Sequence, residues 1–389
     1  MQVISAKKTA FFLQQKAVYI IYFIAINAMN IAALPTSKMN TWNIFRSSFW
    51  HIIKHDDIYT MYPAEFFDQY QYSPSFPLLF APFASLPYYI GYFFWNNLSM
   101  LLIPFLIFRF KNFSTQKKAI VCYIGLIEML VCLQGTQSNV MIANLILLAF
   151  LSFENKQQWL AAFAIAAGTY VKIFPIIAAS LFLLYPDKLK FVLKMIVALL
   201  VLGALPLMIF SPAELGLLYK KWFDIIVADQ GDNSGRISLT GMMQVYLHLS
   251  NFSKLIIQIL GILIFCLMYI RTNLFKEYYY RIYFLCSVLL WVTLFNHVSE
   301  IFTYSIAICG VGFWFIHQKP GRNMNIFILF FVFIATVLSI DPTPRVIIKY
   351  IYEHSLKALP FTLIWLCIIY QMLSKKQDFF KLNSATEEN

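Results

Sequence analysis

Acidic side chains gather in one polar stretch near the N-terminus, residues 36–85, called here the first polar segment. It holds four carboxylates among aromatic and proline residues: Asp56, Asp57, Glu65 and Asp68. A carboxylate at a binding site can take the proton of a reacting hydroxyl group, which is general-base catalysis. Asp57 is the first candidate for this catalytic role and Asp68 the second. The alternatives are a turn residue for Asp57 and a first-turn helix position for Glu65.

Two cations are candidates for binding an anionic group such as a phosphate. Lys172 interrupts an apolar run, where an unpaired charge is costly. Arg345 ends a proline-rich turn, residues 341–345 (DPTPR). Either side chain suits a phosphate, since lysine offers a point charge and arginine a fork of donors. The alternatives are a lysine that extends to the membrane surface and an arginine that belongs only to the turn.

A third group of polar residues follows a long apolar run at residues 296–300 (NHVSE). Asn296, His297 and Glu300 are candidates for binding phosphate or hydroxyl groups of a substrate. The alternative is ordinary hydrogen bonding at the end of a helix. Glu128 lies inside another apolar run, where we expect a buried tyrosine or amide partner.

The elements that position these residues are apolar helices. Apolar residues make up 60% of the chain and charged residues only 12%, whereas a soluble domain has about 25% charged residues. A membrane-spanning helix needs about 20 mostly apolar residues. We therefore predict an all-α polytopic transmembrane bundle of about twelve spans. The predicted spans are residues 17–35, 86–108, 119–133, 139–153, 158–172, 174–186, 191–211, 254–271, 281–296, 301–316, 324–340 and 359–373.

The basic residues set the orientation of these spans. Most of the Lys and Arg residues fall in short loops on the side of the N-terminus, which predicts that both termini are cytoplasmic. The whole chain, 1–389, is then a single membrane domain. Its external face carries the large first loop, residues 36–85, a second loop, residues 211–253, and a third segment, residues 341–358. Apolar spacing over residues 41–54 predicts an amphipathic helix in the membrane interface.

Composition also excludes several classes of protein. The net charge of +12 is scattered at the ends of apolar runs, unlike the dense basic stripe of a nucleic-acid-binding domain. The six cysteines all lie in apolar runs without metal-ligand spacing. We therefore expect no nucleic-acid partner, no metal site and no cofactor.

Several short motifs, in order along the chain, resemble glycosyltransferase family 87. Asp57-Ile58-Tyr59 and the following Tyr62-Pro63 also resemble this family. The motif at residues 134–139 has one residue inserted relative to the family's motif. The motifs are residues 72–87 (YSPSFPLLFAPFASLP) followed by 95–97 (WNN), 134–139 (QGTQSN) followed by Asn144, 168–175 (GTYVKIFP) and 296–300 (NHVSE).

The resemblance implies a membrane glycosyltransferase of the type C fold. It implies a polyprenyl-phosphate sugar donor, commonly of mannose, a lipid or glycan acceptor, and a site on the external face of a bacterial plasma membrane. Lys172 matches the lysine of the family's third motif. The family commonly has an aspartate soon after the first span, but residues 40–43 (NTWN) contain no acid. This departure leaves the choice of base open between Asp57 and Asp68.

Two other functions remain open on the sequence. A transporter or flippase of lipid-linked glycans would also be polytopic, although it usually places polar residues at mid-membrane. A non-catalytic membrane subunit would account for the missing early acid. Carboxylates gathered in the first polar segment favour the enzyme.

Overall fold

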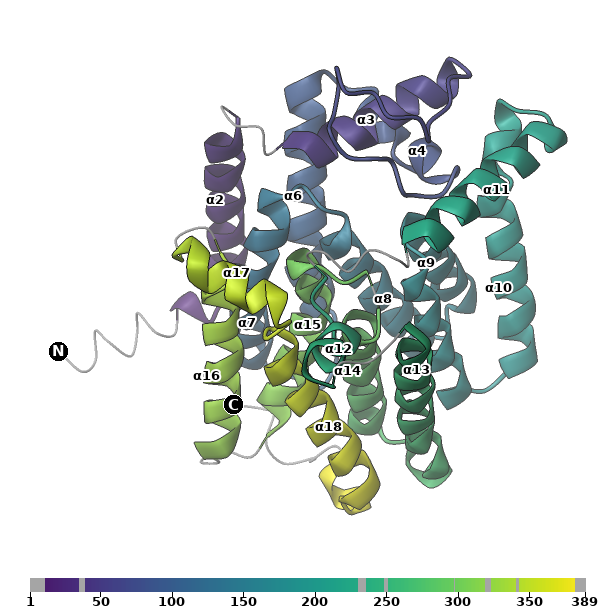
Figure 1. Ribbon diagram of the computed structural model, residues 1–389. Helices are drawn as coiled ribbons and strands as arrows, with labels where there is room; N and C mark the ends of the chain where they lie inside the picture. Colours follow the sequence, from purple (N-terminus) through teal and green to yellow (C-terminus); the bar gives the residue numbers. More distant parts are fainter. Residues whose placement is uncertain are drawn as a thin grey trace.

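The protein is all-helical over the residues that the structure describes. The computed structural model describes residues 11–34, 39–229, 236–247, 251–296, 298–318, 323–340 and 343–381. Within these ranges every regular element is an α- or a 3₁₀-helix, which confirms the predicted all-α class. Figure 1 shows the longer helices side by side, with α3 and α4 at one end of the bundle.

Each of the twelve apolar runs forms a helix. The bounds differ from the predicted ones by a few residues, mostly where a helix ends in a short 3₁₀ turn. The helices are α2 (Gln15–Ala33), α6 (Tyr88–Ile107), α7 (Thr115–Gln134), α8 (Asn139–Glu154), α9 (Gln158–Val171), η2 (Phe174–Leu184), α10 (Lys188–Gly203), α13 (Asn251–Cys266), α14 (Tyr278–Leu294), α15 (Tyr304–His317), α16 (Asn323–Val337) and α18 (Ala358–Ser374).

Helix length separates these elements into two groups. Among the described residues, α2 and α6 are the two helices that are long and apolar enough to cross a membrane alone. A third is the pair α17 (Arg345–Glu353) and α18, which together pass the same test across a 47° bend. Helix α7 has 20 residues but does not pass the combined test of length and composition, and the other apolar helices are shorter. Helix length and composition therefore do not confirm the predicted count of twelve crossings.

The first polar segment folds onto α6 through aromatic packing. Its helix α3 (Asn40–Ile53) matches the predicted amphipathic helix over 41–54. Trp42 and Phe45 are fully buried, and their rings contact Phe80, which lies between α4 (Phe76–Leu79) and α5 (Ala81–Ala84). This packing fixes the N-terminal end of α3 above the rest of the bundle.

The remaining helices connect the bundle to its loops. Helix α11 lies against the first polar segment, where the Trp222 indole N–H donates to the Gln71 carbonyl at 3.1 Å. Helix α11 spans Pro212–Asp229, and the other connecting helices are short. They include α12 (Leu239–Leu247), η3 (Leu205–Met208), η4 (Leu267–Ile270), η5 (Thr272–Leu274), η6 (Ile301–Thr303) and η7 (Gln377–Phe379).

Helices α14 and α15 form the centre of the molecule, and nearly all their residues are buried. Two ion pairs lie close to this centre. Arg281 of α14 holds Glu154 with nitrogen–oxygen distances of 2.6 and 2.9 Å. The partner of Glu128 is Lys357, at 2.9 Å, instead of the expected tyrosine or amide. Both side chains of this second pair are almost completely buried.

Candidate active site

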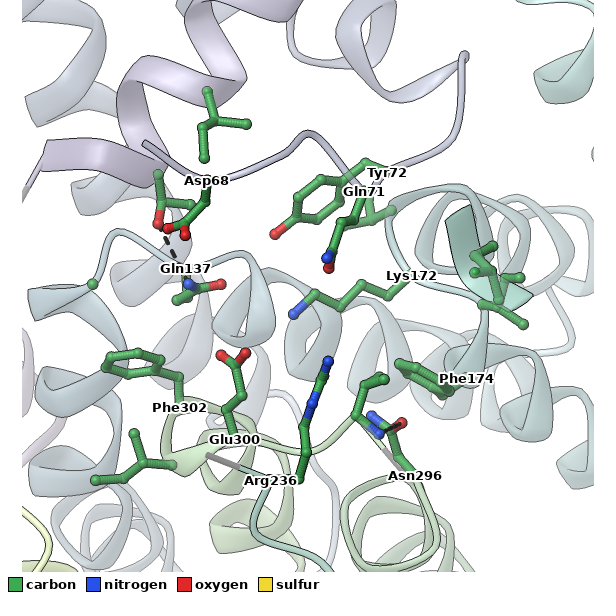
Figure 2. Close-up of a pocket in the computed structure, with 18 of the residues that line it drawn as sticks. Asp68, Gln71, Tyr72, Gln137, Lys172, Phe174, Arg236, Asn296, Glu300 and Phe302 are labelled. Atoms are coloured by element: carbon green, nitrogen blue, oxygen red, sulfur yellow. Dashed lines mark hydrogen bonds between the residues drawn. The ribbon is translucent and has the colours of Figure 1, made fainter. Parts of the chain in front are cut away.

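A cavity of about 940 Å³ lies between the first polar segment and the helical bundle. Figure 2 shows the ends of Lys172, Arg236 and Glu300 directed toward one another, with Asp68 beside Gln137. Distant parts of the chain supply the polar wall. They are residues 67–72, the turn at 134–137, Lys172 at the junction of α9 and η2, Arg236, and the turn at 296–302.

Asp68 lines this cavity and is held by the first residue of α3. The Asn40 amide nitrogen donates to one Asp68 carboxylate oxygen at 2.8 Å. The Asn40 amide oxygen accepts from the Phe67 backbone N–H at 3.0 Å. Asp68 itself is exposed on its loop, so the buried Asn40 supplies the fixed end of this contact.

Lys172 lies where α9 ends and the chain turns back into η2. Gly168 leaves room for the close approach of Pro175, since a Cβ at position 168 would lie 3.1 Å from the Pro175 Cβ. The backbone of Lys172 is extended, and its ammonium group donates to the Asn139 amide oxygen at 3.0 Å. The same group lies 5.9 Å from the centre of the Tyr72 ring. The predicted break at Lys172 is therefore a real end of a helix that presents a cation to the cavity.

Arg236 reaches the cavity from a segment whose backbone is held by three hydrogen bonds. The Arg236 carbonyl accepts from the Ser355 hydroxyl at 3.1 Å. The next residue, Ile237, donates its N–H to the Ser299 carbonyl at 2.6 Å, and its carbonyl accepts from the Tyr304 hydroxyl at 3.2 Å. The Arg236 side chain lines the cavity, and its guanidinium group is directed toward Lys172 (Figure 2).

Glu300 and Asn296 line the same cavity from the turn between α14 and η6. Glu300 is the N-cap of η6, and its side chain and that of Thr303 form a reciprocal capping box. The Asn296 amide oxygen accepts from the Val298 N–H at 2.9 Å. Glu300 lies within electrostatic reach of Lys172, so this turn brings an anion to the cationic side of the cavity.

Another part of the cavity wall is apolar. Ile173 and Ile176 of the α9–η2 region and Ile262 of α13 line it, although they are 37%, 43% and 45% exposed. Neighbouring side chains of α13, Ile259 and Leu263, are exposed as well. The apolar side of the cavity therefore borders an apolar outer surface, and a hydrocarbon chain fits such a surface.

Asp57 does not line the cavity. One carboxylate oxygen pairs with Lys221 of α11 at 2.8 Å and accepts from the Thr60 hydroxyl at 3.2 Å. The other accepts from the Tyr59 N–H at 3.1 Å. Partial burial opposes ionisation, but these hydrogen bonds and the Lys221 charge outweigh it and lower the pKa of Asp57. Asp57 thus joins the first polar segment to α11.

One other predicted residue, Arg345, also lies apart from the cavity wall. Arg345 is the exposed first residue of α17 and is not among the cavity residues. His297 lies outside the described residues. The structure brings together Asp68, Lys172, Asn296 and Glu300 from the sequence-based candidates, and it separates Asp57 and Arg345 from them.

Several cavity residues were not singled out on the sequence. Arg236 follows a stretch rich in Gly, Ser and Asn, residues 229–235, and its only signal was its position among few external cations. Tyr72 and Gln137 fall inside the family motifs, and Gln137 donates to the Thr41 hydroxyl of α3 at 3.4 Å. Burial raises the pKa of Tyr72, so its phenol stays a neutral hydrogen-bonding group.

The fold and the cavity define a class, an all-helical protein whose cavity combines charged and apolar side chains and borders an apolar outer surface. The family follows from comparison with protein-family models, in which the model of Glycosyltransferase family 87 matches residues 70–296. This match covers more than half of the chain, so the protein belongs to glycosyltransferase family 87 and is a membrane-associated glycosyltransferase. No curated protein matches the sequence. Lys172, Arg236 and Asn296 lie within the matched residues, whereas Asp68 and Glu300 lie outside them.

Proposed function

We propose that this glycosyltransferase moves a sugar from a polyprenyl-phosphate donor to a lipid or glycan acceptor. Mannose is the first sugar to test, as the family resemblance implies. The observation that carries the proposal is one cavity with two cations, Lys172 and Arg236, two carboxylates, Asp68 and Glu300, and an apolar side. A lipid-linked sugar phosphate needs all three features, because its phosphate is anionic, its tail is apolar and its acceptor must lose a proton.

The chemistry divides the cavity residues by role. Asp68 takes the proton of the acceptor hydroxyl, and the acceptor oxygen attacks the anomeric carbon of the sugar. The bond between that carbon and the phosphate oxygen breaks, and its electron pair leaves with the polyprenyl phosphate. Lys172 and Arg236 stabilise the charge that grows on the leaving phosphate. Attack from the side opposite the phosphate inverts the anomeric centre.

We also propose that the chain crosses a bacterial plasma membrane about twelve times, with both termini in the cytoplasm. The support is that each of the twelve apolar runs is helical and that basic residues gather on the side of the termini. On this topology the cavity faces the external side. The short helices then match a locally thin bilayer or tilt little within it.

Transfer by the purified protein tests the donor. Labelled polyprenyl-phosphate sugars and, in parallel, nucleotide sugars are offered with lipid and glycan acceptors. We expect transfer only from the lipid-linked donors. A Lys172→Gln variant should lose at least roughly tenfold in kcat/KM for the donor, because a charge-assisted contact to the phosphate is lost. The matched control is Lys349→Gln, an exposed lysine of α17 outside the cavity wall.

The outcomes separate the competing functions. No transfer from any sugar donor by protein that unfolds cooperatively on heating would overturn the enzyme proposal for this chain. Movement of label across a vesicle membrane without attachment to an acceptor would indicate a flippase instead. Transfer from a nucleotide sugar alone would reject the lipid-linked donor while keeping the glycosyltransferase.

A further inference from the structure

The side chain of Asn40 connects two neighbouring points of the loop that carries Asp68. Its amide oxygen accepts from the Phe67 backbone N–H at 3.0 Å, and its amide nitrogen donates to Asp68 at 2.8 Å. These two contacts fix the orientation of the amide, since a flipped amide would turn NH₂ toward a backbone N–H and oxygen toward a carboxylate. Asparagine satisfies both contacts, whereas an ionised aspartate has no hydrogen to donate to Asp68.

Asn40 is also the rigid member of the pair. It is 8% exposed and begins α3, whose Trp42 and Phe45 are fully buried against the aromatic residues above α6. Thr41, the next residue, accepts a hydrogen bond from Gln137 on the other wall of the cavity. Asp68 by contrast lies on an exposed loop. The position of the carboxylate in the cavity therefore depends on the α3 end of the contact.

We propose that Asn40 is a positioning residue that holds Asp68 as the general base of this glycosyltransferase. The inference rests on the proposed function. The Asn40 bond occupies one carboxylate oxygen and leaves the carboxylate further acceptor sites for the proton of the acceptor hydroxyl. A base must lie within hydrogen-bond reach of that proton, so the loss of its anchor reduces turnover more than it reduces donor binding.

Asn43 supplies a matched control on the same helix. It also contacts the first polar segment, because its amide nitrogen donates to the Glu65 carbonyl at 3.3 Å and its amide oxygen accepts from the Tyr88 hydroxyl at 2.5 Å. It does not line the main cavity. Substitution of Asn43 thus perturbs the packing of α3 against the loop without touching the Asp68 contact.

The first experiment compares Asn40→Ala and Asn43→Ala in the sugar-transfer assay. We expect Asn40→Ala to lower kcat by roughly tenfold to a hundredfold while KM for the donor changes less than about twofold. Asn43→Ala should keep kcat near the wild-type value. Thermal unfolding of both variants checks folding. Equal kcat values for Asn40→Ala and the wild-type protein would overturn the inference while leaving the proposed function intact.

The second experiment uses pH dependence, which a purely structural role would not move. Asn40→Asp places two carboxylates at hydrogen-bond distance, and such a pair holds a proton between them. Asp68 must lose that proton to act as base, so the acid limb of the pH–rate profile should move to higher pH by about one unit or more. Asn43→Asp should leave the limb unchanged.

Each remaining outcome of the pH experiment is also decisive. An Asn40→Asp profile identical to the wild-type profile would reject the contact with the base. A more active Asn40→Asp variant would place the base at position 40 instead of position 68. No transfer by the wild-type protein would remove the proposed function and this inference together, which distinguishes that case from a failure of Asn40 alone.

Discussion

At the scale of single residues, two carboxylates eleven positions apart take different places. Asp57 is tied to Lys221, which lies 164 residues further along the chain, and Asp68 to Asn40, which lies 28 residues earlier. Both acids occur in the same aromatic, proline-rich loop. Local sequence pattern predicts that this loop carries acids, but the choice between them depends on partners from other helices. The sequence alone ranked Asp57 first as the general base. The proposed mechanism assigns this role to Asp68, because Asp68 lines the cavity and Asp57 does not.

Exchanging each acid for its amide tests this choice. We expect Asp68→Asn to lower kcat by roughly a hundredfold or more, since general-base catalysis contributes about that much. Asp57→Asn should keep kcat within a few fold, because its carboxylate lies outside the cavity. Donor binding, measured separately, should change little in either variant. If Asp57→Asn lost turnover while Asp68→Asn stayed active, the base would have to be assigned to Asp57.

At the scale of elements, the buried pair of Glu128 and Lys357 supports the turn that carries Glu300. Glu128 lies in α7, and Lys357 lies at the bend between α17 and α18. The Lys357 ammonium also contacts the Ile301 carbonyl at 3.5 Å and lies 5.1 Å from the centre of the Tyr304 ring. One cation thus joins three elements directly behind the cavity wall.

Breaking this pair on one side should be costly. Lys357→Met leaves the Glu128 carboxylate buried without its partner, which we expect to cost about 3–5 kcal/mol of stability. The double variant Glu128→Gln with Lys357→Met removes both charges and should be more stable than Lys357→Met alone. Thermal unfolding in detergent compares the stability of the wild-type protein, the two single variants and the double variant. Strict additivity of the two single effects would contradict the coupling, and Lys349→Met, an exposed lysine, is the control.

At the same scale, sequence patterning predicted helices better than it predicted their partners. All twelve apolar runs are helical, and the break at Lys172 lies where a charge and Pro175 interrupt the run. The sequence placed Lys357 in the third external segment, residues 341–358, whereas its side chain is buried against Glu128. A charge pattern along the chain indicates loop ends, but it does not show which charges pair across 229 residues.

At the scale of the whole molecule, the cavity is assembled from parts of the chain that lie far apart. Asp68, Lys172, Arg236 and Glu300 come from four separate segments, and the apolar side comes from η2, α11 and α13. The helical bundle is what brings them together, so the site depends on its packing. The sequence predicted the fold class but not this assembly, because single-sequence patterns carry no information on long-range contacts.

At this scale the main question is how many helices cross the membrane, because several of the apolar helices are short. Helices α2 and α6 are long enough to span alone, whereas α10 has 16 residues and so extends about 24 Å, short of a hydrocarbon core of about 30 Å. The two possibilities differ most around α10. With about twelve crossings, Lys188 and Lys220 lie on opposite faces of the membrane. If only α2, α6 and the α17–α18 pair cross, both residues lie on the same face.

Labelling of single cysteines in intact cells decides between these topologies. The starting protein lacks Cys266 and Cys367, and it receives a cysteine at one of three exposed positions, Met61, Lys188 or Lys220. We expect an impermeant maleimide to label positions 61 and 220 from outside and position 188 only after permeabilisation. Equal access to positions 188 and 220 would reject a crossing by α10. Labelling of position 188 alone from outside would indicate the reversed orientation. The cavity, with its lipid-linked donor, would then lie on the cytoplasmic face.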